Sequence, residues 1–297
     1  MTEGIIIKAL SGFYYVAADG KIIDCKARGR FRLDGSSPLV GDRVRVSLDA
    51  HGKGRVDEVK ERKNWFIRPA VANIDTLVFV AANTNPVTDP FLVDRFSVIA
   101  AEAGCELIVC VNKTDIDPGD TLFEIFTKAG FPVVRASAVT GEGADELRRL
   151  LRGKVSAFSG NSGVGKSSLL NVLLPDAHIK TAEVSEKLGR GKHTTRHVEL
   201  YALGDDTYIA DTPGFASLDV TMTNVILKEN LQYDFPDFEP YIGKCRFHDC
   251  AHLKEPGCAV TEAVADGLIA PSRYRSYARL YEISAQHKFW EYKEEQA

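Results

Sequence analysis

The stretch that most constrains this chain is Gly-Asn-Ser-Gly-Val-Gly-Lys-Ser-Ser at residues 160–168. The apolar run Val-Ser-Ala-Phe-Ser precedes it, and a pattern typical of a helix follows it until Pro175. A strand, a glycine-rich turn and a helix in this order match the phosphate-binding pattern G-x-x-x-x-G-K-[ST] in full. The sequence therefore predicts an α/β domain with a phosphate site at the N-terminus of a helix.

The residue types in this turn suit phosphate binding. Gly160 and Gly165 let the backbone turn, and consecutive N–H groups then face the phosphates. Lys166 would reach the β- and γ-phosphate oxygens, and the hydroxyl of Ser167 would bind Mg²⁺. A glycine turn without a ligand would not need a lysine and then a serine at the start of the helix. We expect contacts to the nucleotide from Gly160, Asn161, Ser162, Gly163, Val164, Gly165, Lys166, Ser167 and Ser168.

A second motif, Asn-Lys-Thr-Asp at residues 112–115, directly follows the apolar run Glu-Leu-Ile-Val-Cys-Val. Its side chains should lie at the carboxyl end of a buried strand, where open α/β sheets bind ligands. The carboxylate of Asp115 can accept two hydrogen bonds, which matches N1–H and the exocyclic amine of guanine, whereas N1 of adenine is an acceptor. GTP is therefore favoured over ATP, with Asn112 bracing the loop. The residues expected at the base are Asn112, Lys113, Thr114, Asp115, Ser137 and Ala138.

The segment Tyr-Ile-Ala-Asp-Thr-Pro-Gly, residues 208–214, would carry a strand to the phosphate end of the site. Asp211 would hold Mg²⁺ through water, and the N–H of Gly214 would sense the γ-phosphate. Upstream, Gly-Arg-Gly-Lys-His-Thr-Thr supplies Thr194 and Thr195, one of which should complete the magnesium shell. Together with Lys166, these residues form the expected catalytic machinery.

The residue after Gly214 is Phe215, whose side chain cannot hydrogen-bond the attacking water. Intrinsic hydrolysis should therefore be slow. His193 is the polar residue best placed in the sequence to position that water. The other interpretation is that His193 shapes its loop or contacts RNA, and the sequence leaves both open.

In this chain the base-reading motif stands before the phosphate-binding motif. With that order the chain resembles the circularly permuted GTPases, and most closely the ribosome small subunit-dependent GTPase A (RsgA) family, along essentially its whole length. The resemblance implies hydrolysis of GTP to GDP and phosphate, stimulated by the small ribosomal subunit, during late assembly of that subunit. It also implies that the partners are the subunit and its rRNA. The alternative function is a GTP-gated RNA-binding module that acts on another structured RNA.

Residues 4–61 contain short β-rich runs separated by turn signals. Short strands in a segment of this size favour an all-β barrel of the oligonucleotide-binding (OB) type, which binds nucleic acid through one face and its loops. Lys26, Arg28, Arg30 and Arg32 would form a phosphate-contacting strip on this barrel, or they are an ordinary solvated face; the sequence leaves both open.

Near the C-terminus, Cys245, Cys250, His252 and Cys258 have the spacing C-x4-C-x-H-x5-C. Three thiolates and an imidazole suit one four-coordinate structural Zn²⁺. The set also matches the zinc motif of the family that the chain resembles, residue for residue. His248 competes as a ligand, because spacing alone does not exclude it. The tail that follows predicts a helix with its aromatic residues in the core and with three candidate contacts to rRNA, namely Arg273, Arg275 and Arg279.

These patterns predict a multidomain chain, and its 44% hydrophobic content supports folded cores. We expect an all-β OB-like barrel at residues 1–65, a circularly permuted α/β GTPase domain at residues 66–220 and a mainly α zinc-binding domain at residues 221–297. The net charge of −4 argues against an indiscriminate nucleic-acid coat. No apolar run approaches the ~20 residues that cross a bilayer, so we expect a cytoplasmic protein without membrane contact, and a monomer.

Overall fold

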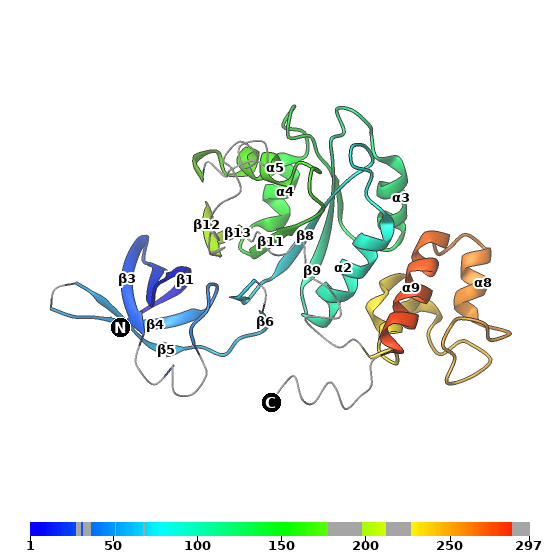
Figure 1. Ribbon diagram of the computed structural model, residues 1–297, viewed down its shortest axis with the longest axis horizontal. Coiled ribbons are helices and arrows are strands. Elements are labelled where there is room, and N and C mark those ends of the chain that lie inside the picture. The colour runs from blue at the N-terminus through cyan, green and yellow to red at the C-terminus, as the bar shows by residue number, and fades with distance from the viewer. Residues whose placement is uncertain are drawn as a thin grey trace.

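The computed structural model describes residues 1–27, 31, 37–50, 52–67, 69–177, 198–211 and 227–286. Within these ranges the chain forms a small β-barrel, a central sheet flanked by helices and a C-terminal lobe, which follow one another along the longest axis of the molecule (Figure 1). No helix in the described ranges is long and apolar enough to cross a bilayer.

The N-terminal barrel closes because its first strand pairs with two neighbours. The strand order is β1-β2-β3-β5-β4, and β4 pairs back onto β1. Inward-facing residues such as Val16, Val44 and Val56 are fully buried and alternate with outward-facing ones, as the two-residue period of a strand requires. The expected all-β barrel is therefore confirmed. Its strands are β1 (Thr2–Leu10), β2 (Phe13–Ala18), β3 (Lys21–Ala27), β4 (Arg43–Leu48) and β5 (Gly54–Val59).

The basic strip proposed on the barrel is described only at Lys26. Its ammonium lies 5.0 Å from the centroid of the Phe13 ring on the neighbouring strand. Arg28, Arg30 and Arg32 lie outside the described residues, so the phosphate-contacting role of the strip stays a prediction.

The barrel joins the central sheet edge to edge. Lys8 of β1 pairs with Glu199 of β12 (Glu199–Gly204), and their side chains form an ion pair at 3.0 Å. The chain itself passes from the barrel to the sheet through a small hairpin of β6 (Trp65–Phe66) and β7 (Val71–Ala72). One hydrogen-bonded surface therefore runs from the barrel into the central sheet.

The central sheet has the strand order β10-β9-β8-β11-β13-β12. Its pairings are parallel except that of β12 with β13. Every residue of β8 is buried, with Leu77 and Phe79 facing α2 and α3, and Val78 and Val80 facing α4 and α5. Burial on both faces explains the continuous apolar runs in the sequence. The elements are β8 (Thr76–Ala82), α2 (Pro90–Glu102), β9 (Glu106–Asn112), α3 (Asp120–Lys128), β10 (Val133–Arg135), α4 (Ala144–Leu151), β11 (Val155–Ser159), α5 (Lys166–Leu173), η1 (Pro175–Ala177) and β13 (Thr207–Asp211).

The order of the strands reverses at one point. From β8 the chain builds outward through β9 to β10, and it then returns to place β11 on the other side of β8. Loops that leave the carboxyl ends of β8 and β11 diverge, which opens the crevice where α/β sheets bind ligands. The phosphate-binding turn follows β11 and the motif at residues 112–115 follows β9, so both motifs lie at this edge.

The C-terminal lobe packs on α2, with α9 alongside that helix (Figure 1). Its centre is a cluster of three fully buried aromatic residues, Phe235, Phe238 and Tyr277, with ring centroids between 4.8 and 5.3 Å apart. The expected aromatic core of the tail helix is therefore present at Tyr277. The elements of the lobe are η3 (Leu231–Asp234), η4 (Pro236–Tyr241), α8 (Ala259–Ala265) and α9 (Pro271–Ser284).

A buried arginine locks the lobe to the central domain. The guanidinium of Arg273 donates to Oδ1 of Asp94 on α2 at 2.7 Å and to both carboxylate oxygens of Asp237 at 2.6 and 3.2 Å. Arg273 and Asp94 are both 0% exposed. The expectation that Arg273 contacts rRNA is therefore wrong, because its donors are used inside the protein. Burial raises the pKa of Asp94, although Arg273 favours the charged carboxylate.

We predict that Arg273→Met lowers the free energy of unfolding by about 3–5 kcal/mol, because it leaves the carboxylates of Asp94 and Asp237 buried without a countercharge. Urea unfolding, followed at the first transition, measures this loss. The matched control is Arg275→Met, two residues further along α9 at an exposed position, which should change stability by less than about 0.5 kcal/mol. Equal losses in the two variants would contradict the role assigned to Arg273.

Candidate nucleotide site and metal cluster

The turn at residues 160–165 has the backbone that only glycines adopt easily. Gly160, Gly163 and Gly165 have φ values of 140°, 83° and 88°. A Cβ at Gly160 would lie 2.2 Å from the carbonyl oxygen of Val80 on β8, so the turn rests directly on the neighbouring strand. The fully buried Val164 anchors it in the core. Lys166 begins α5, with Nζ 3.5 Å from the carbonyl oxygen of Gly160. The N-terminus of α5 therefore faces the crevice, as an anion site requires.

Asn112 joins this turn to the other motifs of the site. Its side chain is 1% exposed. Nδ2 donates to the carbonyl oxygen of Val164 at 2.8 Å, and Oδ1 accepts from the N–H of Ala138 at 3.3 Å. A Cβ at Gly165 would come within 2.4 Å of the same amide nitrogen. One side chain thus holds the phosphate-binding turn and the Ser137–Ala138 loop in place, which is the bracing expected of Asn112.

Asp115 is exposed at the mouth of the crevice and is held from one side. The hydroxyl of Ser137 donates to its Oδ1 at 2.6 Å, while the same hydroxyl accepts from the N–H groups of Val139 and Thr140 at 3.2 and 3.1 Å. Because both the donor and the acceptor sides of that hydroxyl are used, the orientation of the Asp115 carboxylate is well defined.

Lys113 and Thr114 make different contacts in the loop. The ammonium of Lys113 donates to the carbonyl of Asn85, and Lys113 itself has a φ of 69°. The hydroxyl of Thr114 lies 2.8 Å from Oε2 of Glu142 and 3.0 Å from the carbonyl oxygen of Ala136. Lys113 therefore lies along the crevice, whereas Thr114 ties the loop to the segment after β10.

Residues 83–89 form a wall of the site that the sequence analysis did not identify. Asn83 donates to Oδ1 of Asp117 at 2.9 Å, next to the base motif. The carbonyl of Asn85 receives Lys113, and Cδ of Pro86 lies 3.3 Å from the position of a Cβ at Gly163. The hydrogen bonds from Asn83 and from the N–H of Gly119 lower the pKa of Asp117. The available signal was the polar turn Asn-Thr-Asn-Pro at the carboxyl end of a buried strand.

The candidate catalytic residues are described in part. The backbone of Asp211 ends β13, one residue beyond the pairing of Ala210 with Ala157 of β11, which places residue 211 at the carboxyl edge beside the strand that precedes the phosphate-binding turn. The side chain of Asp211, together with His193, Thr194, Thr195, Gly214 and Phe215, lies outside the described residues.

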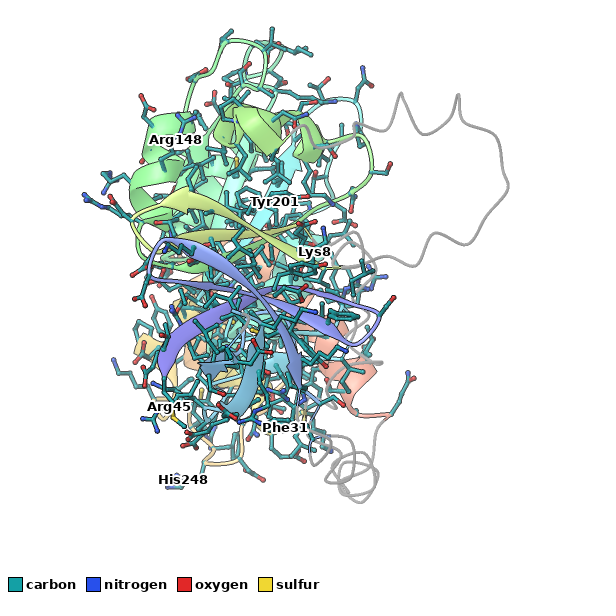
Figure 2. The ribbon with its side chains drawn as sticks, turned by 90° about the vertical axis from the view of Figure 1, so that its left-hand side faces the viewer. Lys8, Phe31, Arg45, Arg148, Tyr201 and His248 are labelled. Carbon is teal, nitrogen blue, oxygen red and sulfur yellow. The ribbon has the colours of Figure 1, made fainter. Side chains whose placement is uncertain are left out.

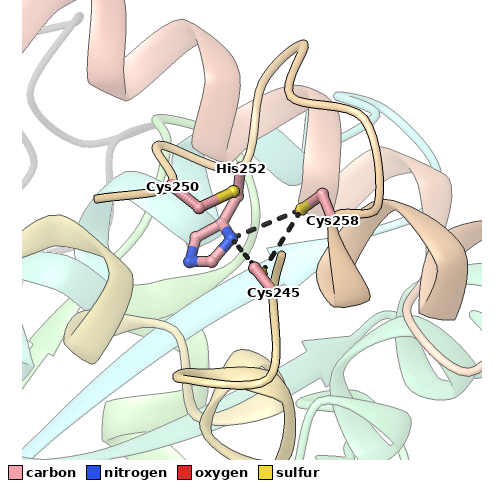
Figure 3. Close-up of side chains that lie close together, drawn as sticks. All are labelled: Cys245, Cys250, His252 and Cys258. Atoms are coloured by element: carbon pink, nitrogen blue, oxygen red, sulfur yellow. Dashed lines mark hydrogen bonds between the residues drawn. The ribbon is translucent and has the colours of Figure 1, made fainter. Parts of the chain in front are cut away.

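The four predicted zinc ligands come together in the C-terminal lobe (Figure 3). Their ligand atoms all lie within 4.8 Å of one another. Sγ of Cys245 is 3.9 Å from Sγ of Cys258, and Nδ1 of His252 is 3.5 and 3.4 Å from these two sulfurs. A tetrahedral zinc site with ordinary bond lengths has sulfur pairs about 3.8 Å apart and nitrogen–sulfur pairs about 3.6 Å apart. The arrangement therefore fits a tetrahedral Zn²⁺.

A neighbouring amide orients the imidazole of the cluster. Nε2 of His252 lies 2.9 Å from Oε1 of Gln232, so Nε2–H donates and the lone pair of Nδ1 faces the sulfurs. Burial lowers the pKa of His252, which favours the neutral imidazole that a metal ligand must be. Gln232 is far in sequence from the cysteines and carried no motif, so the sequence analysis missed it.

His248 lies outside the cluster. Its side chain is exposed at the edge of the molecule (Figure 2), and the group of four ligand atoms does not include it. The backbone around the cluster is tied to α9 instead, because the hydroxyls of Tyr274 and Tyr277 donate to the carbonyls of Leu253 and Ala251 at 2.9 and 3.0 Å. The cluster that the structure brings together therefore leaves out His248.

Comparison with known proteins gives matches over nearly the whole chain. The family described as RsgA GTPase matches residues 59–221, and the RsgA N-terminal domain matches residues 3–56. A small ribosomal subunit biogenesis GTPase RsgA of Caldanaerobacter subterraneus subsp. tengcongensis is 45% identical over 281 residues, which are 94% of each chain. The protein of the same name from Moorella thermoacetica is 43% identical and covers 96% of this chain and 99% of its own.

Two solved structures are similar to the whole fold. YjeQ from Thermotoga maritima has a TM-score of 0.81 at 36% identity and covers 97% of this chain and 99% of its own. YloQ, described as a circularly permuted GTPase, has a TM-score of 0.80 at 35% identity and covers 97% of this chain and 96% of its own. The similarity extends through the barrel, the central sheet and the lobe.

Proposed function

This chain belongs to the RsgA family of GTPases, and from that membership we propose that it hydrolyses GTP to GDP and phosphate during late assembly of the small ribosomal subunit, with turnover stimulated by the subunit. The observation that carries the proposal is the buried amide of Asn112, which hydrogen-bonds the phosphate-binding turn and the Ser137–Ala138 loop together. This arrangement holds a phosphate site and a base site at a set separation, as a guanine nucleotide requires.

The triphosphate would bind at residues 160–168. The first N–H groups of α5 and its partial positive charge attract the phosphates, and Lys166 would bind the β- and γ-phosphate oxygens. Hydroxyl and carboxylate oxygens are the donors that Mg²⁺ prefers, so Ser167, Asp211 and one of Thr194 or Thr195 fit its shell. When bound there, Mg²⁺ would neutralise charge on the phosphates.

The attacking water needs a group that Phe215 does not provide. We assign this positioning to His193 on its place in the sequence, with shaping of its own loop or contact with RNA as the other interpretation. Gly214 would contact the γ-phosphate through its N–H. Both residues belong to segments on either side of the hairpin of β12 and β13, so the phosphate end of the site depends on these segments.

Guanine would be recognised by Asp115. Its carboxylate accepts from Ser137 at Oδ1 and can still accept from N1–H and the exocyclic amine, because each carboxylate oxygen has two lone pairs. The N–H of Ala138, which donates to Oδ1 of Asn112 at 3.3 Å, would contact guanine O6 when the base is bound. Lys113, held by the carbonyl of Asn85, would cover the base with its alkyl stem.

Cys245, Cys250, His252 and Cys258 would hold one structural Zn²⁺. Four protein ligands leave no open position for a water, so the metal would stabilise the lobe and would take no part in hydrolysis. Burial raises the pKa of the Cys250 thiol to about 12, so metal binding has to displace its proton. We further propose that the chain works as a cytoplasmic monomer whose partners are the small subunit and its rRNA.

The function is tested by measuring GTP turnover with and without purified small ribosomal subunits. We expect slow intrinsic turnover and stimulation of at least about tenfold, which corresponds to about 1.4 kcal/mol of activation free energy. Large subunits at the same concentration serve as the control. A flat response to small subunits would favour the alternative, a GTP-gated module for another structured RNA.

We predict that Asp115→Asn changes base preference. An amide in place of the carboxylate can donate to the C2 carbonyl of xanthine but no longer accepts both guanine donors, so GTP should bind at least about tenfold more weakly and xanthosine triphosphate more tightly. Competition binding against a labelled nucleotide measures both. The control is Glu142→Gln, which also replaces a carboxylate by an amide. Among the hydrogen bonds above, the Glu142 side chain contacts only Thr114. Unchanged preference in the Asp115 variant would refute the assignment.

We predict that Cys250→Ser abolishes binding of zinc, because a hydroxyl replaces one thiolate of a closed tetrahedron. Mass measurement under native conditions should find one zinc in the parent and none in the variant, while GTP binding at the separate α/β domain survives. His248→Ala should keep its zinc, since His248 lies outside the cluster. Retention of zinc by the Cys250 variant, or its loss from the His248 variant, would show that the ligand set is wrong.

A further inference from the structure

A hollow of about 200 Å³ lies in the seam between the central domain and the C-terminal lobe. One wall is the first turn of α2, with Asp89 and Phe91, and the other is a face of α9. These two helices lie side by side in Figure 1. None of the residues expected to bind the nucleotide and none of the four metal ligands lines the hollow, which meets the nucleotide site only at Asp89.

The face of α9 in this hollow is polar and basic. It carries Ser-x-x-Arg twice in succession, at residues 272–275 and 276–279. In a helix, this spacing brings Ser272, Arg275, Ser276 and Arg279 to one side, and all four line the hollow. The sequence analysis treated the arginines of this helix as equivalent, but only Arg275 and Arg279 are exposed, while Arg273 is buried on the adjacent face.

The two arginines are available to a ligand. Neither guanidinium has an ion-pair partner in the part of the chain that the structure describes, in contrast to Arg273, which has two. The guanidinium of Arg279 lies over the ring of Phe91 at 3.8 Å from its centroid. Stacking fixes the plane of the guanidinium and leaves its N–H edge for acceptors, so little side-chain entropy is lost when a ligand binds.

The remaining charges in the hollow favour an anion. Asp89 is the carboxylate that lines it, and its Oδ1 is engaged with the N–H of Phe91 at 3.0 Å as the N-cap of α2. The positive charge of two guanidinium groups and of the N-terminal end of α2 therefore exceeds the negative charge of the single carboxylate, which is already engaged as a cap. The planar fork of arginine and the hydroxyl of Ser272 match the oxygens of a phosphate group. The hydroxyl of Ser276 is not counted, because Ser276 is buried and hydrogen-bonds Asp94.

We propose that this hollow is a docking site for the phosphodiester backbone of RNA on the small ribosomal subunit. The proposal rests on the proposed function, which supplies an RNA-rich partner. The site is open and its arginines are exposed, which suits a backbone that lies across it better than a small metabolite that would have to be enclosed. Phosphate contacts of this kind set position and orientation and carry no base sequence.

The location gives such docking a consequence for the nucleotide site. Asp89 is the last residue of the wall formed by residues 83–89, which contacts Lys113 and the turn at Gly163. Phe91 follows it in the first turn of α2. RNA bound against Phe91 and Arg279 would therefore lie next to the segment at residues 83–89, which borders both the base and the phosphates.

The test compares the parent chain with Arg275→Gln/Arg279→Gln in binding to purified small subunits at several salt concentrations, with a non-hydrolysable GTP analogue present. Each lost phosphate contact should reduce the slope of log K against log salt by about 0.7–0.9, so the double variant should lose about 1.5 units of slope and roughly tenfold in affinity. Arg279→Lys keeps the charge without the fork and should keep most of the slope. Intrinsic GTP turnover and zinc content should equal those of the parent.

The matched control is Arg149→Gln on α4, an arginine that is 71% exposed. Parent-like affinity and slope in the double variant, or an equal loss in the Arg149 control, would overturn the site. A second arm measures binding of the double variant to protein-free rRNA from the same subunits. If the double variant loses affinity for subunits but not for this rRNA, the partner surface is protein, which also overturns the proposal. A parent chain that binds subunits but shows no GTP turnover would refute the proposed function and leave the site standing.

Discussion

Asn112 donates to the carbonyl of Val164 and accepts from the N–H of Ala138, and the rest of the nucleotide site depends on these two hydrogen bonds. Three loops that are far apart in the chain converge on this amide because β9 and β11 flank β8 in one parallel sheet. The amide is buried, so neither bond competes with water. Circular permutation is tolerated for the same reason. The loops converge because their strands are neighbours in the sheet, and the order of these strands along the chain does not change that.

The chain builds outward from this sheet by two different kinds of contact. On one side, the barrel continues the sheet through the pairing of Lys8 with Glu199, where both side chains are about one third exposed. On the other side, the lobe is attached by Arg273, which is fully buried between two carboxylates. Exposed ion pairs contribute little to stability, whereas breaking a buried one is costly. Losing the contact that attaches the lobe therefore costs more stability than losing the contact that attaches the barrel.

Sequence predicts best the parts of this protein whose chemistry is local. The turn at residues 160–168 and the set Cys245, Cys250, His252 and Cys258 could be identified because their ligands need fixed residue types at short spacing. Arg273 could not, because its burial depends on Asp94, 179 residues away, and nothing in Ser-Arg-Tyr-Arg distinguishes it from Arg275. The wall at residues 83–89 and the partner of His252, Gln232, were missed for the same reason: their roles arise from packing between distant segments.

The buried arginine also imposes an order on biosynthesis. Asp94 leaves the ribosome 179 residues before Arg273. Until α9 has been made, the face of α2 that will carry the lobe stays open, with its carboxylate hydrated beside apolar side chains. The last elements to be synthesised convert that open face into a buried, charge-neutralised seam. A chain that ends prematurely in the C-terminal lobe keeps all the residues of the nucleotide crevice but carries an uncovered surface that quality-control proteases and chaperones can recognise.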